Sequence, residues 1–186
     1  MSHSLDFDGI YEKLILLQHY SFGSKKYCSE RLIGSSKDIG NEKYDSYWGW
    51  TKGIISNYTI ECSIKYRLIL DIIENKEDIV DLDKLDKISI ENLNIGDVLL
   101  GDFNLSLRES CNKIIHSKKA VPIWAKSTLN GVKFYYWTGK YKLTGKHKNK
   151  DWEVLLNINQ WAFAMERFFD LFESSDAYLY MGQDWY

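Results

Sequence analysis

The dipeptide Asn130-Gly131 leaves the chain around it very few conformations. A type I′ turn needs positive φ at both central positions, and asparagine followed by glycine is a favoured pair there. The flanking segments, 121–129 and 132–137, are rich in the β-branched and aromatic residues that favour strands. The sequence therefore predicts an antiparallel hairpin centred on this dipeptide.

More strands are predicted after the hairpin. Gly139 and Gly145 punctuate the sequence that follows, and apolar residues then alternate with other residues from Trp152 to Ile158. Alternation of this kind places one side of a strand against a core. We therefore expect a small antiparallel sheet of three or four strands, contributed by residues 120–157.

Helical periodicity covers most of the remaining chain. Apolar stripes with helical spacing predict helices within residues 5–33, with a break at 21–24, and over residues 50–74 and 159–173. The predicted fold class is mainly α (α+β). We expect a single domain over residues 1–186, in which a bundle of about four main helices carries the small antiparallel sheet, inserted before the last helix.

Composition and motifs limit the classes of function. Three cysteines lie far apart without a CxxC pair, which predicts reduced thiols rather than disulfides. The first residues lack the features of a secretion signal, and no apolar run approaches the ~20 residues of a membrane span. The four histidines are scattered, and the known phosphate-loop and zinc motifs are missing. We therefore expect a cytoplasmic protein with no metal, no other cofactor and no membrane partner.

The stretch 105–119 combines a helix start with a polar stripe. Ser106, three residues before Glu109, forms a capping-box pattern, so a helix is predicted to begin at the residue after Ser106. Side chains four residues apart on a helix are neighbours on its surface. The candidate catalytic residues recur at this spacing and are expected along one face: Arg108, Asn112 and His116.

The segment from Asn112 to His116 resembles the second half of the motif of HEPN domains, which are small helical bundles found in RNases, toxins and antiviral systems. Their signature is an Arg, usually followed by a polar residue such as Asn, and then a His a few residues later. Asn112 and His116 match the polar residue and the His, whereas Cys111 stands where the Arg is expected. The nearest Arg is Arg108, about one helical turn earlier.

This resemblance implies a helical fold and metal-independent cleavage of RNA, with the 2′-hydroxyl as nucleophile. In that reaction His116 acts as general acid or base, Arg108 stabilises charge on the phosphate and Asn112 orients the scissile group. The resemblance also implies a homodimer that pairs two motifs, and a place in toxin–antitoxin or antiphage defence systems. It further implies a polar partner on the second helix, either Glu61 or Lys65, although an ordinary salt bridge also explains that pair.

A basic segment follows the motif. Residues 117–150 contain nine lysines and no Asp or Glu, which is unusual in a chain with a net charge of −2. Ammonium groups neutralise phosphates and aromatic rings stack on bases, so this segment is predicted to bind single-stranded RNA. The predicted phosphate contacts are Lys118, Lys119, Lys140, Lys142, Lys146 and Lys148, and the predicted stacking rings are Trp137 and Tyr141. Alternatively, the rings belong to the core and the lysines complement the acidic segment 74–102 or a partner protein.

Two functions are open from the sequence. In the first, a HEPN-like domain binds RNA or a partner macromolecule and is a candidate metal-independent endoribonuclease. In the second, the chain is a non-catalytic helical scaffold or protein–protein interaction module, in which Asn112 and His116 cap and cross-link helices. The aromatic segment 178–186 is predicted to pack on the domain or on a partner chain, which adds contact area to a homodimer.

Overall fold

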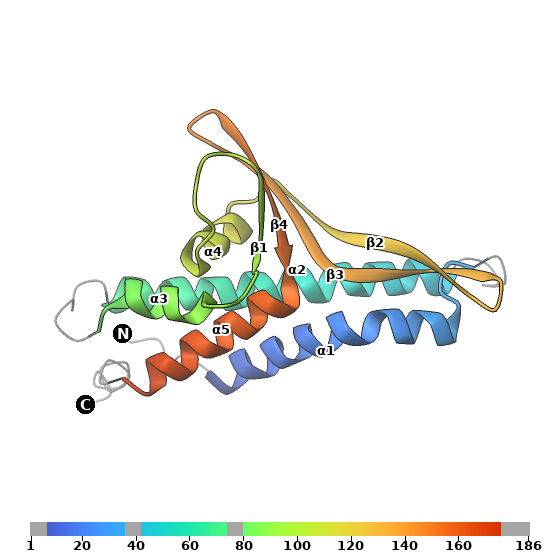
Figure 1. Ribbon diagram of the computed structural model, residues 1–186, viewed down its shortest axis with the longest axis horizontal. Helices are drawn as coiled ribbons and strands as arrows, with labels where there is room; N and C mark the ends of the chain where they lie inside the picture. The colour runs from blue at the N-terminus through green and yellow to red at the C-terminus, as the bar shows by residue number, and fades with distance from the viewer. Residues whose placement is uncertain (1–6, 36–41, 74–79, 176–186) are drawn as a thin grey trace.

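The computed structural model describes residues 7–35, 42–73 and 80–175, and these ranges contain five helices and four strands (Figure 1). The helices are α1 (Phe7–Arg31), α2 (Glu42–Ile73), α3 (Leu82–Ile90), α4 (Leu107–Ile115) and α5 (Ile158–Glu173). The strands are β1 (Gly96–Leu100), β2 (Lys119–Leu129), β3 (Val132–His147) and β4 (Lys150–Asn157). The aromatic segment 178–186 lies outside the described residues, so its predicted packing stays a prediction.

The predicted hairpin is confirmed. Strands β2 and β3 pair antiparallel up to the turn, where Leu129 lies opposite Val132. Asn130 and Gly131 have φ values of 49° and 77°, the positive pair that a type I′ turn requires. The long β2–β3 ribbon reaches over α1 and α2 along the longest axis of the molecule (Figure 1).

Strand β3 is longer than the sequence pattern suggested, because its glycines do not end it. Gly139 has a φ of 78°, and a Cβ at this position would collide with the side chain of Ser21 in α1. Gly145 leaves room for the ring of Trp152, which lies directly against it. Both glycines therefore allow a neighbour to approach a strand that continues past them.

The sheet also includes a strand from outside residues 120–157. Its order is β1-β4-β3-β2, and every neighbouring pair is antiparallel. The α+β class is thus confirmed, but the sheet takes strands from both sides of α4 and is not simply an insertion before the last helix. The acidic segment 74–102 supplies α3 and β1 in its described part.

Helix α3 begins and packs through two aspartates. The side chain of Asp81 accepts a hydrogen bond from the backbone N–H of Lys84 (2.9 Å), which caps the first turn. The carboxylate of Asp86 is largely buried and accepts hydrogen bonds from the hydroxyl of Tyr66 (3.1 Å) and the backbone N–H of Arg108 (3.0 Å). Asp86 therefore joins α2, α3 and the start of α4.

Helix α1 runs without interruption through residues 21–24, so the predicted break there is wrong. The hydroxyl of Ser24 is buried, where it accepts a hydrogen bond from the backbone N–H of Trp137 (3.0 Å) and shares another with the hydroxyl of Tyr47 (2.9 Å). A polar residue at this site therefore holds the ribbon against the helix. Helix α2 begins at Glu42, earlier than expected, whereas α5 has the predicted range to within one residue.

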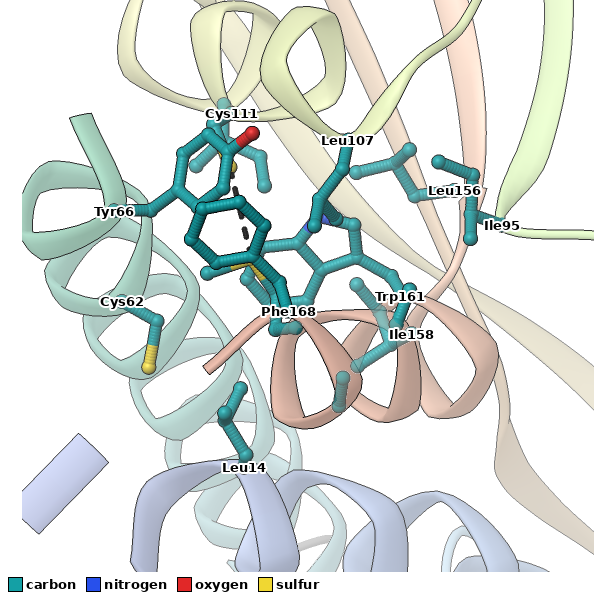
Figure 2. Packing of buried hydrophobic residues seen from close by; sticks show 14 of the residues in the cluster. Leu14, Cys62, Tyr66, Ile95, Leu107, Cys111, Leu156, Ile158, Trp161 and Phe168 are labelled. Carbon is teal, nitrogen blue, oxygen red and sulfur yellow. Dashed lines mark hydrogen bonds between the residues drawn. The ribbon is translucent and has the colours of Figure 1, made fainter. Parts of the chain in front are cut away.

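The core lies where α4 and α5 meet α2 and the sheet (Figure 2). Phe168 of α5 packs edge-on against Tyr66 of α2, with ring centroids 4.6 Å apart. The indole N–H of Trp161 donates to the hydroxyl of Ser110 in α4 (2.9 Å), which satisfies a buried polar group. Burial of each large side chain contributes roughly 1.5–3 kcal/mol to the free energy of unfolding. Within the described ranges, no helix is both long and apolar enough to cross a bilayer.

Candidate nucleic-acid interface

Helix α4 begins as predicted, with Ser106 as its N-cap. The Ser106 hydroxyl accepts a hydrogen bond from the backbone N–H of Glu109 (3.1 Å). The Glu109 carboxylate turns along the helix, where it accepts from the side-chain amide of Asn112 (3.2 Å) and the ammonium of Lys113 (2.8 Å). The first turn of α4 therefore fixes the orientation of Asn112.

Asn112 and His116 line the same cavity, which has a volume of about 590 Å³. We call it the basic cavity. Its lining comes from four elements: α2, α4 with its C-cap residue, and the adjoining ends of β3 and β4. The lining residues are Arg67, Glu109, Asn112, Lys113, His116, Lys146, His147 and Trp152.

Arg108 does not join Asn112 and His116 in the basic cavity. It lines a different hollow, with Asp81 and Asp83. Successive residues at i and i+4 are offset by about 40° around a helix, so a stripe of three fans out. In addition, α4 ends at Ile115, and His116 is its C-cap with φ −100° and ψ 10°. The predicted set of three thus separates into a pair and a single residue.

Cys111, which stands where the HEPN motif has Arg, points into the core (Figure 2). Its thiol lies 3.9 Å from the sulfur of Met165 in α5. Burial raises the pKa of Cys111 to about 12, so the thiol is neutral and unreactive at neutral pH. An Arg at this position of α4 would therefore meet apolar side chains rather than the basic cavity.

Five residues of the cavity lining were not predicted as site residues: Arg67, Glu109, Lys113, His147 and Trp152. The ammonium of Lys113 lies 4.0 Å from the ring centroid of Phe103 and 4.7 Å from that of Trp152, which places a nearly buried cation between two rings. Arg67 of α2 forms an ion pair with Asp71 (3.2 Å). His147 is exposed at the end of β3. Lys113 is itself a residue of α4, but no spacing in the sequence connects Arg67 or His147 to this helix, because tertiary packing alone brings them together.

The two residues of α2 considered as a polar partner for the motif, Glu61 and Lys65, pair with each other. Glu61 accepts ion pairs from Lys65 (3.1 Å) and from Lys13 of α1 (3.2 Å), so the ordinary salt bridge explains this pair. Neither Glu61 nor Lys65 lines the basic cavity, and Arg67 is the α2 residue that does.

Four of the predicted lysines line a second hollow, also of about 590 Å³, which we call the sheet hollow. Lys142 and Lys146 flank Thr144 on one face of β3, and buried Tyr141 and Leu143 lie on the opposite face. Lys118 and Lys119 lie beside Thr144 at the start of β2. Lys140 and Lys148 are exposed but line neither hollow. The residues lining the sheet hollow are Leu100, Lys118, Lys119, Val121, Ile123, Lys142, Thr144, Gly145, Lys146, Asp151, Trp152 and Glu153.

Carboxylates from β4 partly neutralise this surface. Lys142 forms an ion pair with Glu153 (2.7 Å), and Lys146 forms a longer one with Asp151 (3.5 Å). Both acids lie just beyond the acid-free segment 117–150, on the strand that pairs with β3. The acidic segment 74–102 is therefore not what balances these two lysines.

Trp137 and Tyr141 cannot stack on bases, so that prediction is wrong. Each ring is only 1% exposed, on the core side of β3. The indole N–H of Trp137 donates to the backbone carbonyl of Lys140 (2.9 Å), and the Tyr141 hydroxyl shares a hydrogen bond with Ser56 of α2 (3.0 Å). The alternative interpretation, in which these rings belong to the core, is confirmed.

Among the described residues, no group of three or more His, Cys, Asp and Glu side chains is placed to hold a metal ion. Comparisons of the chain with protein-family models, with curated proteins and with solved structures give no match.

Proposed function

We propose that the chain is a HEPN-like domain that binds single-stranded RNA at the basic cavity and cleaves it without a metal. One observation carries the proposal: Asn112 and His116 open into the same cavity as cations from two other elements, Arg67 and Lys146. A phosphodiester held there meets hydrogen-bond donors, positive charge and two imidazoles. These are the groups that metal-independent cleavage of RNA requires.

In the proposed reaction, the 2′-oxygen of the RNA attacks the adjacent phosphorus, and the bond from phosphorus to the 5′-oxygen breaks. The products are a 2′,3′-cyclic phosphate and a free 5′-hydroxyl. One of His116 and His147 accepts the 2′-hydroxyl proton and the other donates a proton to the leaving oxygen. Arg67 takes the charge-stabilising role that the sequence resemblance gave to Arg108, and Asn112 orients the phosphate.

The wider setting belongs to the same proposal. The HEPN resemblance implies a homodimer in the cytoplasm and a role in toxin–antitoxin or antiphage defence. A second copy brings a second pair of Asn112 and His116, which supplies more groups to hold a phosphate than one cavity has.

The second candidate is a non-catalytic scaffold or protein-interaction module, and one feature favours it. Each cation of the basic cavity already has a carboxylate partner: Arg67 with Asp71, Lys113 with Glu109 and Lys146 with Asp151. In this alternative the ion pairs fix side chains within α2, α4 and the β3–β4 hairpin, and Lys113 holds α4 against the sheet through the ring of Trp152. Asn112 contributes through its bond to Glu109.

Incubation of labelled single-stranded RNA with the protein in EDTA distinguishes the two functions. Cleavage that His116→Ala abolishes, with products ending in a cyclic phosphate, supports the nuclease. His19→Ala is the matched control, because His19 is also exposed but lies on α1 and lines another hollow. Absence of cleavage with every RNA tried, or equal cleavage by wild type and His116→Ala, contradicts the nuclease and favours the scaffold.

A further inference from the structure

The basic cavity and the sheet hollow are neighbours, because Lys146 and Trp152 line both of them. Lys146 and Trp152 lie close to the β3–β4 turn, where Lys146 pairs with Asp151 and Gly145 with Trp152 in the sheet register. A ligand that fills the cavity and extends past these two residues therefore passes directly onto the sheet.

The sheet register gathers four lysines around Thr144. Lys119 of β2 lies opposite Thr144, and the backbone N–H of Lys118 donates to the Thr144 carbonyl (2.8 Å). Lys142 and Lys146 lie two residues before and after Thr144, on the same face of β3. One strand position is thus surrounded by positive charge from two neighbouring strands.

The four lysines are not equivalent. Lys142 and Lys146 share their charge with Glu153 and Asp151. Lys118 and Lys119 are exposed and form no ion pair with a carboxylate in the described part of the chain. An incoming polyanion therefore meets two uncompensated cations at the edge of the sheet, beside the apolar side chain of Val121.

We propose that the two hollows form one binding track for a single-stranded RNA several nucleotides long. The scissile phosphate lies in the basic cavity, and the strand continues over Lys146 to an anchoring site at Lys118 and Lys119. The track rests on the proposed function, since it describes the substrate of the same cavity. Unpaired bases turn their faces to aliphatic side chains such as Val121 and Ile123, which the stacked bases of a duplex cannot do.

The test is binding of labelled single-stranded RNA, a trinucleotide and a twelve-nucleotide strand, at low salt. Lys118→Glu/Lys119→Glu is expected to weaken binding of the longer strand by about tenfold or more, as loss of phosphate contacts and charge reversal require. The trinucleotide covers less of the track, so its binding is expected to change less than about twofold. Lys87→Glu/Lys133→Glu is the matched control, because both lysines are exposed and line neither hollow.

The other outcomes contradict either the track alone or the proposed function together with it. Equal weakening by the two double variants, or none by either, overturns the track but leaves cleavage at His116 to be judged separately. Wild type that binds no RNA of either length removes the proposed function together with the track. Polyglutamate that binds as tightly as RNA at the same salt assigns the surface to an acidic protein and overturns the track.

Discussion

Lys113, in the lining of the basic cavity, keeps its ammonium group beside two aromatic rings and a carboxylate. Its side chain is 11% exposed, against 28% for its partner Glu109. An enclosed cation of this kind gains both from the ring faces and from a short ion pair, while each exposed pair in water gains little. Lys113 is therefore expected to contribute to the stability of α4 on the sheet.

We predict that Lys113→Met lowers the free energy of unfolding by about 1–3 kcal/mol, since it removes the cation–π contacts and one partner of Glu109. The control is Lys26→Met, which breaks an ion pair with Glu30 of the same four-residue spacing but with side chains 79% and 60% exposed. That change is expected to cost less than about 0.5 kcal/mol. Urea denaturation compares the two, and equal midpoints would contradict the structural role of Lys113.

At this scale, local spacing predicted Asn112 and His116 correctly as neighbours, because a helix repeats within the chain itself. Arg67 and His147 could not be found in the same way, since they lie on α2 and β3 and reach the cavity only through tertiary packing. Arg108 lies apart from this pair because a stripe of residues four apart drifts by about 40° around the helix at each step.

Strand β3 shows how alternation along a strand separates buried side chains from accessible ones. Trp137, Tyr141 and Leu143 lie at odd positions and are buried, whereas Lys140, Lys142 and Lys146 lie at even positions and are accessible on the other face. Side chains of a strand alternate between its two faces, so the buried rings and the accessible lysines of β3 cannot contact the same ligand. The sequence displays this alternation, but it separates the rings from the lysines only if the strand continues through Gly139.

Gly139 makes that continuous strand possible, and its replacement tests the packing of β3 on α1. Gly139→Ala is expected to lower the free energy of unfolding by about 1–3 kcal/mol, because the residue has positive φ and a Cβ would collide with Ser21. Gly23→Ala is the contrasting control: nothing lies within 4 Å of a Cβ there, and alanine favours the helix by about 0.5–1 kcal/mol. Thermal unfolding should shift in opposite directions for the two variants, and a neutral Gly139→Ala would refute the close contact.

For the molecule as a whole, two buried thiols of the core are expected to make the folded state less stable at alkaline pH. Burial raises the pKa of Cys62 and of Cys111 to about 12, against about 8.5 in an unfolded chain. Below pH 8.5 both states keep these protons, so the thiols contribute no pH dependence. As the pH rises further, only the unfolded chain ionises, and folding stability is lost progressively up to the folded pKa.

Between pH 8 and pH 10 we expect each thiol to lower the free energy of unfolding by on the order of 2 kcal/mol. Urea midpoints at the two pH values measure the loss. In Cys62→Ala/Cys111→Ala the absolute stability is lower, but the drop between the two pH values should be smaller than in wild type. An unchanged drop would mean that the two thiols are accessible to solvent in the folded protein.

The overall architecture was only partly predictable. The α+β class, the hairpin and the range of α5 follow from local periodicity, which a sequence displays directly. The pairing of β1 with β4 does not, because strand partners distant in the chain leave no local signal and β1 is only five residues long. The carboxylates that neutralise Lys142 and Lys146 are close in the chain, on the hairpin strand β4 just beyond the acid-free segment, rather than in the segment 74–102.

The pairing of β1 with β4 also sets an order of events during synthesis. Leu100 ends β1, and residues 101–149 must be added before β4 begins at Lys150. At a ribosomal rate of roughly 5–20 residues per second, β1 waits about 3–10 seconds for its partner. Throughout that interval the nascent chain carries an unpaired apolar strand, including Leu99 and Leu100, that a chaperone or a neighbouring nascent chain can bind.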